Sequence, residues 1–166
     1  MNAKKLTLSG IVMACYVIIM YFTAGFSFGA YQIRIATAIY GLAYLFPFLV
    51  LPLGLSNLLS NMLLGGLGFF DIIGGGAVGL LTAGTCALLG RHHRSEWWII
   101  LPITLIPGLG VAAWLSYLLK MPYPVLALSL CIGQFLPAVF GAILAKTLRK
   151  FSVPYFKDYP RNGDSL

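Results

Sequence analysis

The stretch RIATAIYGLAYLFPFLVLPLGLSNLLSNMLLGGLGFFDIIGGGAVGLLTAGTCALLGR, from Arg34 to Arg91, decides the fold of this chain. Between its two terminal arginines it carries one charged side chain, Asp71. A carboxylate at the middle of a membrane helix costs roughly 3 kcal/mol on insertion scales. Asp71 therefore either serves a function or lies at an interface where its charge is tolerated.

The composition is that of an integral membrane protein. Of 166 residues, 60% are hydrophobic and 9% are charged, whereas a soluble domain has about 25% charged residues. A helix needs about 20 apolar residues to cross ~30 Å of hydrocarbon. Five stretches lack Lys, Arg, Asp and Glu: Leu6–Ile33, Ile35–Phe70, Ile72–Gly90, Trp97–Leu119 and Met121–Ala145. The second is long enough for two short helices and each of the others for one.

These lengths predict an all-α membrane bundle of six transmembrane helices, folded as one domain over residues 1–166. The third helix is short, and the Pro- and Gly-rich segments Pro52–Gly54 and Gly65–Gly68 indicate a break on each side of it. The six expected helices are Leu6–Ala24, Ile35–Val50, Leu53–Leu64, Ile72–Leu89, Trp97–Leu119 and Val125–Leu148.

The net charge of +7 is an orientation signal. With both termini in the cytoplasm, nine of the 11 Lys and Arg residues fall on the cytoplasmic side, several of them in a basic tail at residues 149–166. Arg34 and Lys120 fall outside. This bias follows the positive-inside rule. It predicts a multi-pass protein of the cell membrane with a lipid environment, and nucleic-acid binding is not expected.

Polar residues gather at the outer end of the expected bundle. Asn57 and Asn61, four residues apart, share one helix face. Carboxylate and amide groups beside aromatic rings suit a planar, hydrogen-bonding small molecule. The candidate ligand-binding residues are Gln32, Arg34, Asn57, Asn61, Asp71, Trp114, Tyr117 and Gln134.

Structural roles compete with ligand binding at these positions. Asn57 and Asn61 could join helices through interhelical hydrogen bonds. Asp71 could be the N-cap of the fourth helix, beside the positive end of its dipole. Arg34 could be only an interfacial anchor. The residues themselves leave these alternatives open.

No catalytic or metal-binding constellation is expected. His92 and His93 are adjacent in a basic loop, a spacing that does not suit a metal site. The sequence has no phosphate loop and no HExxH motif, so no cofactor is expected and no ATP is bound by this chain. A stand-alone membrane enzyme using Asp71 remains an alternative, as does a structural subunit without a ligand.

Two stretches resemble a known family: YQIRI at Tyr31–Ile35, and NMLLGGLGFFDIIGG at Asn61–Gly75. They are similar to the substrate-binding S components of energy-coupling factor (ECF) transporters, and most similar to the queuosine-precursor type called QueT or QrtT. The resemblance runs from the first to the sixth helix. It is most specific over Gln32–Gly75 and weak in the fifth helix.

The resemblance implies a six-helix protein that captures a vitamin-like molecule at the outer membrane face, here a queuosine precursor or related 7-deazaguanine. Another vitamin-like ligand is the alternative. It implies association with an ECF T component and two ATPase subunits, which use ATP to power import. Gly10 and Ala14 form a small-xxx-small pair that permits close helix approach, and the resemblance assigns this pair to contact with the T component.

Two positions depart from the family pattern. The family commonly has a glutamate three residues after the arginine, where this chain has Thr37. It commonly has Gly-Glu in the sixth helix, where this chain has Gly133 and Gln134. Both differences remove an acid that would pair with an amine on the ligand, so the exact substrate stays open.

Overall fold

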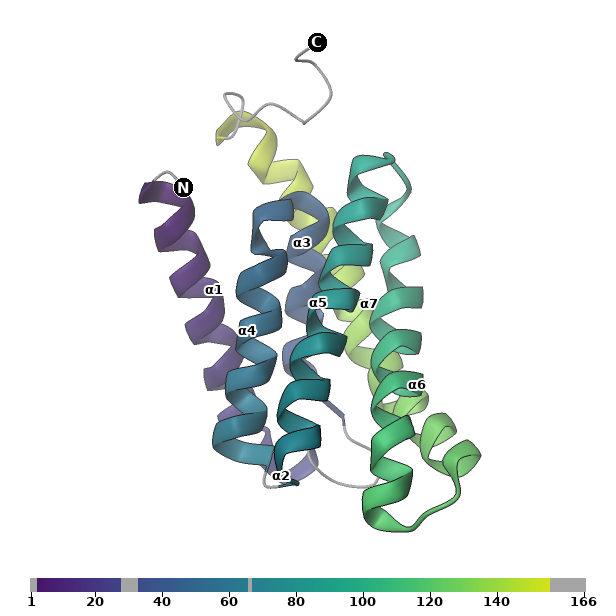
Figure 1. Ribbon diagram of the computed structural model, residues 1–166. Helices are drawn as coiled ribbons and strands as arrows, with labels where there is room; N and C mark the ends of the chain where they lie inside the picture. The colour runs from purple at the N-terminus through teal and green to yellow at the C-terminus, as the bar shows by residue number, and fades with distance from the viewer. Residues whose placement is uncertain (1–2, 28–32, 66, 156–166) are drawn as a thin grey trace.

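The structure, a computed structural model, describes residues 3–27, 33–65 and 67–155 (Figure 1). Within these ranges the regular structure is helical throughout. The elements, in chain order, are α1 (Ala3–Phe22), α2 (Ala24–Ser27), η1 (Ile35–Tyr40), α3 (Gly41–Leu45), η2 (Pro47–Leu49), α4 (Val50–Ser60), η3 (Asn61–Gly65), α5 (Phe69–Arg91), η4 (Glu96–Ile99), α6 (Ile100–Leu119) and α7 (Tyr123–Tyr155). The all-α prediction is confirmed for the described residues.

Five helical segments of the described chain are long and apolar enough to cross a membrane. They are Ala3–Phe22, Pro47–Gly65, Phe69–Arg91, Glu96–Leu119 and Tyr123–Lys150. The remaining segment, Ile35–Leu45, is apolar but shorter. Length therefore supports five spans, and it does not by itself support the expected sixth.

The predicted division between the second and third helices was wrong. The break falls at Phe46, whose backbone angles (φ −126°, ψ 82°) are not helical, because a residue that precedes a proline is pushed out of the α region. Pro52 instead lies in the first turn of α4, where its missing N–H costs little. Gly54 makes room for Leu80, since a Cβ there would come 2.4 Å from Leu80 Cδ2. The second segment is consequently the short one and the third is full length.

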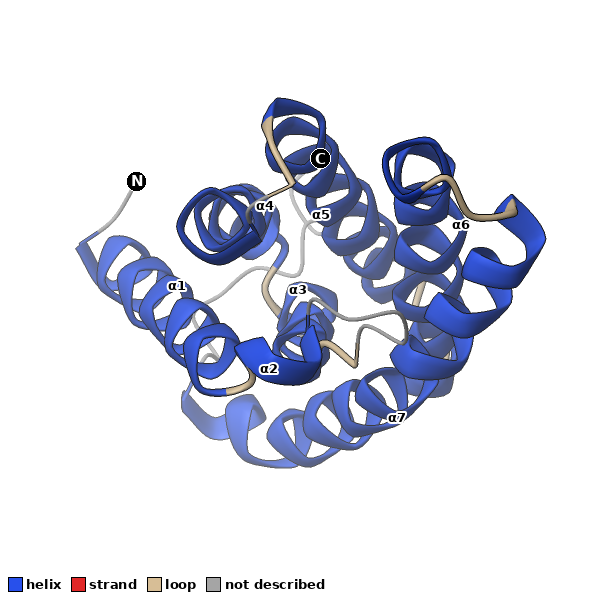
Figure 2. Ribbon diagram, turned by 90° about the horizontal axis from the view of Figure 1, so that it is seen from below, coloured by secondary structure: helices blue, strands red, loops and turns tan. Residues whose placement is uncertain are grey.

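The short segment lies at the centre of the bundle. Seen along the bundle, α3 is enclosed by α1, α4, α5, α6 and α7 (Figure 2). The ten-residue stretch 35–44 is mostly buried, and Tyr40 is 1% exposed. Its 3₁₀ and α turns add up to roughly 20 Å, against about 30 Å of hydrocarbon. Helices long enough to span the membrane thus surround a shorter central helix.

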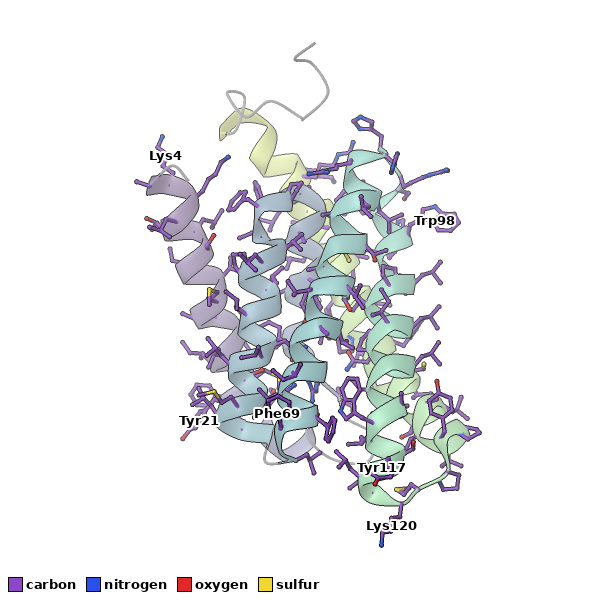
Figure 3. All side chains as sticks on the ribbon, in the orientation of Figure 1. Lys4, Tyr21, Phe69, Trp98, Tyr117 and Lys120 are labelled. Carbon is purple, nitrogen blue, oxygen red and sulfur yellow. The ribbon has the colours of Figure 1, made fainter. Side chains whose placement is uncertain are left out.

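Counting the short segment, successive segments run in opposite directions, and the start of α1 and the end of α7 lie at the same end of the bundle (Figure 1). Lys4 and Trp98 mark this end, which we call the Lys4 end (Figure 3). Tyr21, Phe69, Tyr117 and Lys120 mark the opposite end, which we call the Lys120 end (Figure 3).

Polar contacts fasten the helices together at the Lys4 end. Arg149 of α7 forms an ion pair with Glu96 of η4. The ammonium group of Lys146 lies 5.5 Å from the centroid of the Trp97 ring, within the range of a cation–π interaction. The Tyr44 hydroxyl of α3 donates a hydrogen bond to the Arg94 carbonyl oxygen.

Candidate ligand-binding site

A cluster of polar side chains lies inside the bundle between the central segment and helices α4 to α7. Asp71 belongs to the first turn of α5, two residues after Phe69, which marks the Lys120 end (Figure 3). We call this group the polar cluster, and it consists of Arg34, Thr37, Asn57, Asn61, Asp71, Trp114 and Gln134. Most of the predicted ligand-binding residues therefore come together.

Asn57 connects the central segment to α5. Its Nδ2 donates to the Gly75 carbonyl oxygen at 2.8 Å, and its Oδ1 accepts from Arg34 Nη1 at 3.3 Å. Arg34 is 2% exposed and also donates from Nε to the Ser27 carbonyl oxygen at 3.4 Å. An arginine buried in this way is not an interfacial anchor, so that alternative was wrong.

Asn61 connects the end of α4 to the first turn of α5. It begins η3, a single π-helical turn, a distortion frequent at functional sites. Its Nδ2 donates to the Asp71 carbonyl oxygen at 3.1 Å. Asn57 and Asn61 thus join the same two helices, which confirms the interhelical role considered for both asparagines.

Asp71 does not cap α5. The N-cap is Gly68, at φ 88°, a backbone conformation that favours glycine. Asp71 lies within the first turn, with no side-chain capping bond, so the N-cap prediction was wrong. Its carboxylate instead accepts a hydrogen bond from Trp114 Nε1 of α6, with 3.2 Å between Nε1 and Oδ1. At 1% exposed, the carboxylate is an interior group of the bundle.

Glycines of α5 allow these side chains to approach the helix. A Cβ on Gly75 would come 1.8 Å from Asn61 Nδ2. A Cβ on Gly74 would come 3.0 Å from the Trp114 ring, and one on Gly79 would come 3.0 Å from Asn57 Cβ. The GGGxxG pattern at residues 74–79 is typical of close packing, but the pattern does not indicate which side chains occupy the space.

Thr37 and Gln134 form a second pair within the polar cluster. Thr37 Oγ1 lies 2.8 Å from Gln134 Oε1 and 2.7 Å from the Arg34 carbonyl oxygen. A hydroxyl has one proton to share between these acceptors. The pair joins η1 to α7 at the start of the central segment. Gln134 is among the predicted ligand-binding residues, whereas Thr37 had been noted only as a departure from the family pattern.

The family model of the QueT transporter matches residues 6–150. The chain belongs to the QueT transporter family. The match extends from α1 through the greater part of α7, and it includes every described residue of the polar cluster. Membership in this family, together with the apolar helices, makes the chain a multi-pass membrane transporter. No curated protein and no solved structure matches it.

The remaining predicted residues of this QueT-family chain lie away from the cluster or outside the described residues. Tyr117 is on the last turn of α6 and is 83% exposed. Gln32 lies outside the described residues. Gly10 and Ala14 are exposed on α1, and apart from the adjacent residues and backbone of α1 itself no atom lies within 4 Å of the Cβ position of Gly10. The ligand and partner roles of these four residues stay predictions.

The side chains of the polar cluster can bind a ligand through hydrogen bonds. The cluster contains one carboxylate, one guanidinium group, three amides, a hydroxyl and an indole. Among the described residues, no three His, Cys, Asp or Glu side chains come together in a way that could hold a metal ion. These donors and acceptors can orient a small polar molecule between helices that contribute no more than two residues each.

Proposed function

We propose that this QueT-family chain is the substrate-binding S component of an ECF-type importer for a queuosine precursor or a related 7-deazaguanine. The single observation that carries the proposal is the buried carboxylate of Asp71, which lies among amides and beside the Trp114 indole near one end of a membrane bundle. Ionisable groups inside a membrane bundle commonly mark a substrate site.

The donors and acceptors of the polar cluster complement a planar purine-like ring. A carboxylate accepts from ring N–H and amino groups, while amide and guanidinium N–H groups donate to a carbonyl. Asp71 and Arg34 provide the two charged types within one cluster. The Trp114 indole provides an aromatic face on which a ring can stack.

The orientation we propose places the Lys4 end in the cytoplasm and the Lys120 end outside. Most of the exposed basic residues in the described part of the chain, among them Arg91, Arg94 and Lys150, belong to the segments that meet at the Lys4 end. This distribution agrees with the positive-inside rule. A membrane-impermeant thiol reagent should label Lys120→Cys in intact cells and leave His92→Cys unlabelled. Labelling of His92→Cys alone would show that the protein has the opposite orientation.

The energy for import would come from partner subunits, namely an ECF T component and two ATPases. The exposed small residues Gly10 and Ala14 leave a flat strip on α1, and such strips allow a second membrane helix to pack closely. Copurification with a T–ATPase module tests the assembly. Ala14→Leu should abolish copurification, whereas Ala77→Leu, at an exposed alanine of α5, should not.

Thermal stability with a panel of ligands tests the substrate. A molecule that binds only the folded protein raises its melting temperature. We expect a rise with 7-deazaguanines, including queuine and its precursors, and none with B vitamins. A rise with a B vitamin alone would contradict the assigned substrate while leaving the role of S component intact. Absence of any association with a T–ATPase module, whatever the ligand, would contradict that role.

A further inference from the structure

Two buried oxygen atoms of the polar cluster have no hydrogen-bond partner among the described residues. They are Oδ1 of Asn61 and Oδ2 of Asp71, on side chains that are 2% and 1% exposed respectively. Leaving a buried acceptor without a donor is unfavourable, and more so for a carboxylate oxygen. The two residues are also neighbours, since Asn61 Nδ2 donates to the Asp71 main chain at 3.1 Å.

The orientation of the Asn61 amide is fixed by its neighbours. Oxygen and nitrogen of an amide can be distinguished only through their hydrogen bonds. The Asp71 carbonyl oxygen accepts and cannot donate, so the amide atom that faces it, 3.1 Å away, is the nitrogen. Oδ1 of Asn61 is therefore the acceptor that remains.

Asp71 is held in place by the indole that lies beside it. Trp114 Nε1 can only donate, and it donates a hydrogen bond to Oδ1 of Asp71 at 3.2 Å. The other carboxylate oxygen, Oδ2, can therefore accept from a second donor. The indole packs against α5 at Gly74, where a Cβ would come 3.0 Å from the ring. An aromatic surface and two unused acceptors thus occur together.

We infer that Asn61 Oδ1 and Asp71 Oδ2 bind the edge of the ligand ring that carries a ring N–H next to an exocyclic amino group. The inference rests on the proposed function and specifies how that site selects its substrate. A 2-amino-4-oxopyrimidine ring presents two such donors side by side, whereas a ring without the amino group presents one. Stacking beside Trp114 favours a flat ring over a flexible ammonium group at this position. Asn61 and Asp71 are accordingly the residues that determine selection for the amino group.

A matched pair of ligands tests the inference without any change to the protein. 7-Deazaguanine and 7-deazahypoxanthine share one ring system, and only the first carries the 2-amino group. Calorimetric titration of the purified full-length protein should give an affinity at least about tenfold higher for 7-deazaguanine, as expected for a hydrogen bond to a charged acceptor. Equal affinities would overturn the inference while the proposed function stands.

A substitution at Asp71 tests whether this residue causes the preference for the ligand with the 2-amino group. In Asp71→Asn, removal of the 2-amino group from the ligand should change the affinity much less than in the unaltered protein. The control is Thr85→Val, which removes a hydroxyl that bonds only to Leu81 O of the same helix, at 2.8 Å, and it should retain the full tenfold preference. An equal preference in Asp71→Asn would overturn the role of Asp71. If neither deazapurine binds but a B vitamin does, the proposed substrate class fails instead.

Discussion

Trp114 Nε1 donates a hydrogen bond to Asp71 Oδ1 across 3.2 Å, and this bond joins the C-terminal half of α6 to the first turn of α5. Through this bond the carboxylate contacts a neighbouring helix. An aspartate at this position usually interacts with the helix N-terminus. Here the capping position is filled by Gly68, so the charge of Asp71 is available to groups between the helices.

Trp114→Phe removes the donor and retains an aromatic ring. We expect the affinity for 7-deazaguanine to fall about tenfold, because a hydrogen bond to a charged group contributes about 1.5–3 kcal/mol. Calorimetric titration measures the change. Trp98→Phe, at the Lys4 end (Figure 3), is the matched control and should bind normally. Normal affinity in Trp114→Phe would show that the indole nitrogen does not orient the carboxylate.

Gly75→Ala introduces a Cβ that would lie 1.8 Å from Asn61 Nδ2. The amide must move, so we expect a loss of about 1–3 kcal/mol in the free energy of unfolding together with weaker ligand binding. Gly84→Ala is the control on the same helix, where the nearest atom outside the local helix backbone, Val50 Cγ1, is 3.9 Å from the Cβ position.

Thermal melting in detergent compares the two glycine variants. Gly84→Ala should melt at the same temperature as the unaltered protein or slightly higher, because alanine is favoured over glycine by up to about 1 kcal/mol within a helix. If Gly75→Ala were equally stable, the close contact between α5 and Asn61 would not be required for the fold.

Gln134→Glu restores an acid while keeping the shape of the side chain and the acceptor that faces Thr37 Oγ1 at 2.8 Å. A negative charge attracts a cationic ligand strongly at a site shielded from water. The affinity for 7-aminomethyl-7-deazaguanine, relative to uncharged 7-deazaguanine, should rise at least about tenfold, a free-energy difference of about 1.4 kcal/mol. Gln134→Met, without added charge, should produce no such rise. An unchanged ratio in Gln134→Glu would place the amine of the ligand elsewhere.

The ion pair between Glu96 and Arg149 joins η4 to α7 at the Lys4 end, with side chains 11% and 44% exposed respectively. Partly exposed pairs of this kind contribute about 0.2–1 kcal/mol. A double-mutant cycle with Glu96→Gln and Arg149→Gln should return a coupling in that range. Strictly additive effects would show that the pair adds nothing to stability. Ligand affinity should stay constant, since the polar cluster lies toward the other end.

The composition was sufficient to predict the helical membrane fold, yet it placed one helix boundary wrongly. Pro47 and Pro52 both lie within one apolar run, and hydropathy gives no means of choosing between them. The choice depends on position within the helix: Pro52 falls in the first turn of α4, where proline is tolerated. Gly54 also suggested a break, but in the structure its missing side chain allows Leu80 to pack against α4.

Residues of the candidate site could be predicted because polar groups are scarce in this chain. The hydrogen-bond partners of these residues could not be predicted. Asn57 and Asn61 are conspicuous in an apolar helix, but their bonds to main-chain atoms of Gly75 and Asp71 depend on how α4 lies against α5. The contact between Thr37 and Gln134 spans 97 residues of sequence. Pairing over such distances follows from tertiary packing, which no local pattern contains.

Ile35–Leu45 is enclosed by longer helices (Figure 2). The length of this segment therefore does not have to match the thickness of the bilayer. Hydrophobic mismatch acts on surfaces that lipid tails touch, and a helix wrapped by protein presents little such surface. Its length is therefore set by its neighbours, and it can begin directly after a buried charged residue, Arg34. In membranes of different thickness, the outer helices would adjust their tilt while the geometry around this inner helix stayed constant.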